Sequence, residues 1–126
     1  MTSRPICVGA WMADRPPAGT EVCRLSVLPD GGGRMFVLAA PSGEFRLLVL
    51  RSGAQCFGYE NCCPHFGIPL AERDDQLILK PHQSVTCNTH YARFRWQDGY
   101  CESGDCAGDA LVPVALRVDA DVVCLA

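Results

Sequence analysis

Two short clusters of cysteine and histidine constrain this chain more than any other feature of its sequence. The clusters are Cys63-Pro64-His65 and Cys87-Asn88-Thr89-His90. Each pairs one thiolate with one imidazole across a tight turn, so two such loops brought tip to tip supply two sulfur and two nitrogen ligands. That donor set binds a metal ion or a metal cluster.

Two kinds of metal site fit two sulfurs and two nitrogens. A structural Cys2His2 zinc site usually has its two cysteines close together in sequence and its two histidines likewise. A [2Fe-2S] centre of mixed ligation needs two cysteines on one iron and two histidines on the other. Here each loop carries one residue of each type, which favours the iron–sulfur centre over zinc.

The residues around these clusters resemble the Rieske family, whose loops read C-x-H and C-x-x-H. Cys63 to Leu70 matches the family's C-P-H-x-G-x-P-L loop. Gly99 with Cys101 to Gly108 is similar to the G-x-C-x-x-G-x-C-x-G tail of some small Rieske ferredoxins. The resemblance covers roughly residues 21 to 126.

The resemblance implies a ligand set and a cofactor, a single Rieske-type [2Fe-2S] cluster per chain. By it, Cys63 and Cys87 hold the inner ferric iron. His65 and His90 hold the outer, reducible iron near the surface. The sequence departs from the family in a longer segment between the loops and in Tyr91, where the family usually has glycine after the second histidine.

Composition limits the class of protein and its partners. With 126 residues, 48% hydrophobic and 20% charged, the chain is expected to fold as one domain. A net charge of −3, with both signs interspersed, offers no continuous positive surface for nucleic acid. The longest apolar run, Met35 to Ala40, is too short to cross a bilayer. Nine cysteines without an apolar signal segment predict a cytoplasmic protein with mostly reduced thiols.

Hydrophobic periodicity predicts an all-β Rieske fold of antiparallel sheets, because no window has an apolar stripe at helical spacing. Leu47 to Leu50 is continuously apolar, as in a strand buried on both faces, and Ala92 to Gln97 alternates with period two. We expect an N-terminal arm over residues 1–20, a domain over 21–126, and a cluster-binding subdomain of two hairpin loops over about 60–100. The other expected strands are Glu21 to Leu28, Arg34 to Ala39, Phe45 to Arg51, Gln55 to Glu60, Gln76 to Lys80, Ser84 to Thr86, Leu111 to Val118 and Val122 to Leu125.

The remaining cysteines and histidine have simpler interpretations. Cys62 and His82 are reserve ligands at most, and His82 is expected on the surface. Cys101 and Cys106 form packed thiols, a disulfide or a second metal pair, and packed thiols are favoured because cytoplasmic disulfides are uncommon. Small buried hydrophobes are expected at the other positions, Cys7, Cys23, Cys56 and Cys124.

The resemblance implies an electron carrier rather than an enzyme. A Rieske-type ferredoxin accepts one electron from a ferredoxin reductase and passes it to a terminal oxidoreductase such as a ring-hydroxylating oxygenase. One alternative is a small Rieske subunit of a larger enzyme, such as a nitrite-reductase-like assembly. The other is a structural Cys2His2 zinc module.

High-potential relatives carry two devices that this sequence lacks. One is a disulfide between the cluster loops, whose positions hold Ile68 and Thr89 here. The other is a pair of hydroxyls, whose positions hold Ala92 and Phe94. Hydrogen bonds to the sulfurs ease electron addition, so their absence predicts a potential of roughly −150 to 0 mV, at the low end of the family range.

Overall fold

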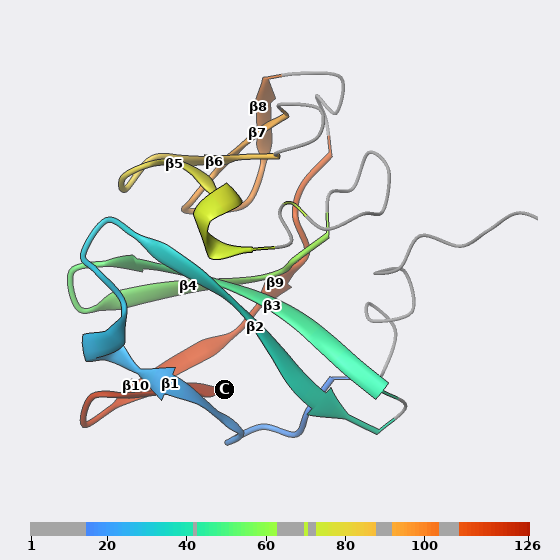
Figure 1. Ribbon diagram of the computed structural model, residues 1–126, viewed down its shortest axis with the longest axis vertical. Helices are drawn as coiled ribbons and strands as arrows, with labels where there is room; N and C mark the ends of the chain where they lie inside the picture. Colours follow the sequence, from blue (N-terminus) through green and yellow to red (C-terminus); the bar gives the residue numbers. More distant parts are fainter. Residues whose placement is uncertain (1–14, 42, 63–69, 71–72, 88–91, 104–108) are drawn as a thin grey trace, which may run out of the picture.

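The computed structural model describes residues 15–41, 43–62, 70, 73–87, 92–103 and 109–126, and these form three antiparallel sheets (Figure 1). Their orders are β1-β11-β10, β2-β3-β4-β9 and β5-β6-β7-β8. The prediction of an all-β architecture is confirmed, since the regular elements among the described residues are strands and two single-turn 3-10 segments, η2 and η3. The elements are β1 (Glu21–Arg24), η2 (Leu25–Val27), β2 (Gly33–Ala40), β3 (Gly43–Ser52), β4 (Gln55–Glu60), η3 (Asp74–Gln76), β5 (Ile78–Lys80), β6 (Ser84–Thr86), β7 (Arg93–Arg95), β8 (Cys101–Ser103), β9 (Pro113–Val114), β10 (Leu116–Asp119) and β11 (Val122–Leu125).

Strand β3 lies at the centre of the molecule and contributes side chains to two hydrophobic cores. Leu47 and Val49 face the core that also holds Leu125 of β11. Leu48 and Leu50 face the core beneath the β5–β8 sheet. Side chains alternate between the two faces of a strand, so a strand covered on both faces needs an unbroken apolar run. The predicted double burial of residues 47–50 is confirmed.

The β5–β8 sheet packs its apolar face on the second of these cores. Ala92, Phe94 and Trp96 are buried, and the residues between them are exposed, as the period-two alternation predicts. The predicted turn at Asp98-Gly99 is also present between β7 and β8. Gly99 has φ +72°, and a Cβ there would lie 2.7 Å from the ring of Tyr59, so glycine allows the close approach of the turn to β4.

Several predicted strands are shorter or divided in the structure. The strand expected over residues 76–80 begins only at Ile78, after η3, and the one expected over 92–97 is reduced to β7. The strand expected over residues 21–28 ends at Arg24, where η2 begins. The strand expected over 111–118 is divided at Ala115 into β9 and β10. Strand β9 pairs with β4 whereas β10 pairs with β11, so the chain changes sheet at that residue. Hydrophobic pattern does not reveal such a change, because both halves bury apolar side chains.

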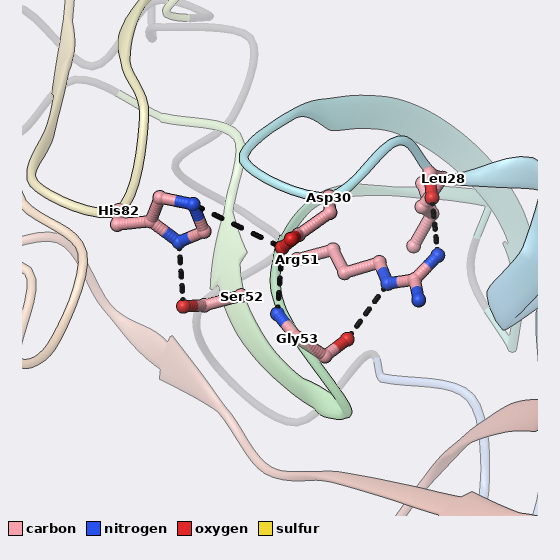
Figure 2. Close-up of polar contacts among 6 residues, drawn as sticks. All are labelled: Leu28, Asp30, Arg51, Ser52, Gly53 and His82. Carbon is pink, nitrogen blue, oxygen red and sulfur yellow. Dashed lines mark hydrogen bonds and ion pairs between the residues drawn. The ribbon is translucent and has the colours of Figure 1, made fainter.

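A polar network joins the turns of different sheets (Figure 2). Nδ1 of His82, in the β5–β6 turn, lies 2.7 Å from Oγ of Ser52 on β3. Its Nε2 lies 3.9 Å from Oδ1 of Asp30, which accepts a 2.8 Å hydrogen bond from the backbone N–H of Gly53. That hydrogen bond, and to a lesser extent the nearby His82 and Arg51, lowers the pKa of Asp30. The network connects the turn before β2, the β3–β4 turn and the β5–β6 turn.

Candidate metal centre

Cys87 is the one predicted ligand that lies within the described residues, and it directly follows β6. Its side chain is fully buried, in the same hydrophobic cluster as Ala92 and Phe94. Its backbone N–H donates a 2.8 Å hydrogen bond to the carbonyl of Ala92. Since Thr86 and Arg93 are also partners, residues 87 and 92 continue the β6–β7 hairpin. The second predicted ligand loop therefore begins and ends at a paired position.

Asn61 and Leu70 stand on either side of the first predicted ligand loop. Asn61 is 3% exposed, and Leu70 is fully buried. Oδ1 of Asn61 accepts a 2.9 Å hydrogen bond from the backbone N–H of Leu70. The Asn61 backbone N–H donates a 3.0 Å hydrogen bond to the carbonyl of Arg46 on β3. The entrance of this loop is thus bonded both to its exit and to the central strand.

The described ends of the two loops share one hydrophobic cluster. Leu70, which follows the first loop, belongs to the same buried cluster as Cys87 and Ala92, which flank the second loop. Leu48 of β3 and Trp96 belong to it as well. The fold therefore brings the exit of the first loop and both ends of the second to one apolar region, as two loops that supply a single metal centre require.

The other predicted ligands, Cys63, His65 and His90, lie outside the described residues. Within the described ranges, no group of three or more His, Cys, Asp and Glu side chains is placed to hold a metal ion. The fit to a [2Fe-2S] cluster rests on two observations. The donor chemistry divides evenly between thiolate and imidazole, and the buried side chain of Cys87 in an apolar cluster limits the access of water to a sulfur ligand.

The contacts of His82 with the described residues join different parts of the frame. It occupies the turn at the opposite end of β6 from Cys87. Besides its contacts with Ser52 and Asp30 (Figure 2), its ring packs at 5.8 Å from that of Trp96. Its side chain is 47% exposed, which confirms the predicted surface position. The sequence did not indicate its role in joining the turns.

The structure bears on two interpretations of the cysteines, the packed thiol at Cys101 and the reserve ligand at Cys62. Cys101 is buried and disulfide-bonded, so the prediction of a packed thiol there was wrong. Cys62 is also disulfide-bonded, which leaves it no thiolate for a metal. Cys106 and Cys7 lie outside the described residues.

The thiols at Cys23, Cys56 and Cys124 belong to the apolar interior of the molecule. Cys124 is buried, as predicted, whereas Cys23 and Cys56 are only partly buried. Both partly buried residues pack against the core that contains Phe45 and Leu125. Burial raises the pKa of each of these two thiols, which keeps them protonated and unreactive at neutral pH.

Comparisons with known proteins give a family and a fold. A family model for the Rieske [2Fe-2S] domain matches residues 20–116. The ferredoxin of carbazole 1,9a-dioxygenase from Nocardioides aromaticivorans IC177 has a similar structure, with a TM-score of 0.69 and 19% identity, over 87% of this chain and 98% of that one. No match is found among curated proteins.

Two further solved structures resemble the chain. One is a chain of the complex of reduced oxygenase and oxidised ferredoxin in carbazole 1,9a-dioxygenase, with a TM-score of 0.71 and 24% identity, over 88% of this chain and 94% of that one. The other is the terminal oxygenase of carbazole 1,9a-dioxygenase from Novosphingobium sp. KA1, with a TM-score of 0.67 and 18% identity, over 86% of this chain and 30% of that one. At these identities the likeness is one of fold.

Proposed function

The chain belongs to the Rieske [2Fe-2S] domain family, and we propose that it works as a Rieske-type ferredoxin that carries one electron at a time. The observation that carries the proposal is the extent of the two matches. The family model spans residues 20–116, and the structural likeness spans 98% of a ferredoxin chain but only 30% of a terminal oxygenase. The fold described here corresponds to the electron-carrying module.

The family's cofactor is a Rieske-type [2Fe-2S] cluster, which accepts and donates a single electron. We assign Cys63 and Cys87 as the ligands of the inner iron, and His65 and His90 as the ligands of the outer iron. The described part of the chain supports this assignment through the exit of the first loop and both ends of the second, which meet in one buried apolar cluster. The apolar stems restrict the access of water to the sulfur side of the centre, while the frame holds the loops together.

The protein is proposed to be a carrier and not an enzyme. The structural likeness supports this, because it spans 98% of a ferredoxin chain but only 30% of a terminal oxygenase. Its proposed partners are a ferredoxin reductase as donor and a terminal oxygenase as acceptor, by analogy with the ferredoxin and oxygenase complexes of carbazole 1,9a-dioxygenase. No nucleic acid is expected among the partners.

We also propose the division of the chain and its location. Residues 1–20 form an arm, residues 21–126 form the Rieske domain, and about 60–100 form the cluster-binding subdomain. The described residues contain no helix long and apolar enough to cross a membrane. The proposed location is the cytoplasm; the disulfide-bonded Cys62 and Cys101 depart from the mostly reduced thiols expected of that compartment.

An electron paramagnetic resonance spectrum of the dithionite-reduced protein tests the cofactor and its ligands. Mixed ligation predicts a rhombic signal whose average g value lies well below that of clusters with four cysteine ligands. His65→Ala and His90→Ala should each abolish the signal, because the outer iron loses one of its two protein ligands. Cys62→Ser should retain it. A silent spectrum with stoichiometric zinc would overturn the proposal in favour of a structural zinc module.

Electron transfer is tested separately with purified partners. A ferredoxin reductase with its nicotinamide cofactor should reduce the protein, and a terminal oxygenase of the carbazole dioxygenase type should reoxidise it. Faster oxygenase turnover in the presence of the protein supports the role of carrier. If the protein has the expected spectrum but purifies only in a stable complex with a larger enzyme, it is a subunit rather than a free ferredoxin.

A further inference from the structure

Asn61 is a buried amide between the end of β4 and the first ligand segment. Its Oδ1 accepts the 2.9 Å hydrogen bond from Leu70, and its Nδ2 donates to Sδ of Met35 at 3.1 Å. Its backbone N–H donates to the carbonyl of Arg46 at 3.0 Å. One residue therefore connects the entrance of the segment, its exit, and both β2 and β3.

The hydrogen bond from Leu70 to Asn61 gives an acceptor to a backbone N–H that water does not reach. Leu70 is fully buried, so its N–H needs an acceptor from the protein. The acceptor comes from a side chain nine residues earlier, on the other side of the ligand segment. An apolar side chain at position 61 would leave this N–H without that acceptor, and the exit of the segment would have to move to find another.

Strand β2 holds the residues after the segment as well as Asn61. Oδ1 of Asp74, on η3, accepts a 2.8 Å hydrogen bond from the backbone N–H of Met35. Oδ2 of Asp74 lies 3.4 Å from Nε of Arg34. Met35 thus meets Asn61 through its sulfur and Asp74 through its backbone. Both flanks of the segment are attached to the same place on the same strand.

We propose that Asn61 is a positioning residue for the metal centre. Its amide fixes the separation and orientation of the two ends of the first ligand segment, so that Cys63 and His65 are supplied as a pair. The inference rests on the ligand assignment proposed above. Fixing the ends of a segment reduces the conformations it can adopt once a ligand dissociates, and so speeds the return of that ligand to the metal. Asn61 should therefore govern how long the cluster is retained.

The experiment compares loss of the visible cluster absorption from the oxidised holoprotein after addition of an iron chelator. Asn61→Leu keeps the branched shape at a larger volume but removes the acceptor, and should lose the cluster about tenfold faster than wild type. Asn61→Asp keeps an oxygen at the position of Oδ1 but loses the donor to Met35 and places a carboxylate at a buried position, so it should lose the cluster more slowly than Asn61→Leu but faster than wild type. Gln83→Leu makes the same chemical change at an exposed residue of the β5–β6 turn, and serves as the control.

Two further measurements separate positioning from general stability. Urea unfolding of the same variants gives their global stability, and a merely structural role predicts cluster loss in proportion to it. Positioning predicts faster loss at matched stability and a changed g anisotropy in the reduced protein. If Asn61→Leu does not fold, Asn61→Ser takes its place, because the shorter serine side chain does not bring its oxygen within reach of the Leu70 N–H.

The outcomes distinguish this inference from the proposed function. A wild-type Rieske spectrum, with Asn61→Leu or Asn61→Ser losing the cluster no faster than Gln83→Leu, overturns the role of Asn61 and leaves the ligand assignment standing. Equal loss from the Asp variant and the Leu or Ser variant also overturns it, because the acceptor would then be irrelevant. A wild-type protein without the Rieske spectrum refutes the ligand assignment itself.

Discussion

Replacing Tyr59 with phenylalanine tests how the β5–β8 sheet is fastened to the rest of the frame. Tyr59 lies on β4, and its buried hydroxyl donates a 2.6 Å hydrogen bond to the carbonyl of Trp96, in the turn after β7. The substitution removes one oxygen atom and leaves that carbonyl without its donor. Losing a buried hydrogen bond of this kind should lower the free energy of unfolding at neutral pH by about 1 to 1.5 kcal/mol.

The size of this effect should depend on pH. Burial, with a smaller contribution from the charge of Asp98, raises the pKa of Tyr59 to about 12. In the unfolded chain a tyrosine ionises near 10. The unfolded state therefore loses the proton first, so the stability from neutral Tyr59 is complete below about pH 10 and falls away as pH rises toward about 12. At about pH 11 the wild type should have lost about 1.4 kcal/mol through this group alone.

The phenylalanine variant has no such titration, so the two stabilities should converge near pH 11. Urea midpoints of both holoproteins, measured in parallel from neutral to alkaline pH, give the difference directly, and alkaline effects common to both proteins cancel. The chain has three tyrosines, and subtracting the ultraviolet titration of the variant from that of wild type isolates Tyr59. Ionisation of Tyr59 near pH 10, or a stability difference that stays constant with pH, would refute the reasoning.

Three other predictions concern the polar network and the cluster. Asp30→Asn should destabilise the protein at neutral pH and make its stability less dependent on pH in acid. The lowered pKa of Asp30 gives the wild type stability that it loses as pH falls below about 4. Urea titrations of both proteins in acid check this. His82→Ala should leave the reduced spectrum unchanged while lowering the urea midpoint, and loss of the signal would make His82 a ligand. Film voltammetry should give a potential of roughly −150 to 0 mV that stays flat through neutral pH. A value above about +200 mV would contradict the inference that Ala92 and Phe94, which carry no hydroxyl, leave the cluster hard to reduce.

The sequence predicted the parts of the fold that depend on local pattern. The double burial of residues 47–50, the alternation of 92–97 and the turn at Asp98-Gly99 each follow from the period of apolar residues or from turn chemistry. The strands expected over Gln76 to Lys80 and Ser84 to Thr86 are present as β5 and β6, with β5 beginning at Ile78. The family was also identifiable from ligand spacing, because two mixed Cys/His loops are a rare arrangement.

Contacts between distant segments could not be read in the same way. Nothing in the order of residues indicates that the Asn61 amide reaches Leu70 and Met35, or that His82 meets Ser52. The one available signal for Asn61 was an amide two residues before a ligand motif, directly after a predicted strand. A disulfide at Cys101 was an alternative but not the favoured one, because the expected compartment keeps thiols reduced and the sequence does not show which thiols meet.

The last residues of β4 explain how a frame of short strands can hold ligand loops accurately. Successive strand residues face opposite sides, so Tyr59 reaches the β7–β8 turn while Glu60 points the other way and pairs with Arg15 at 2.7 Å. The backbone N–H of Glu60 donates to the carbonyl of Val112, and Asn61 then bonds the exit of the segment. A metal site tolerates displacements of only about 0.5 Å in its ligands, and any movement of a stem is passed on to the loop it carries. Fixing the stem from both faces at consecutive residues removes that movement before the first ligand segment begins.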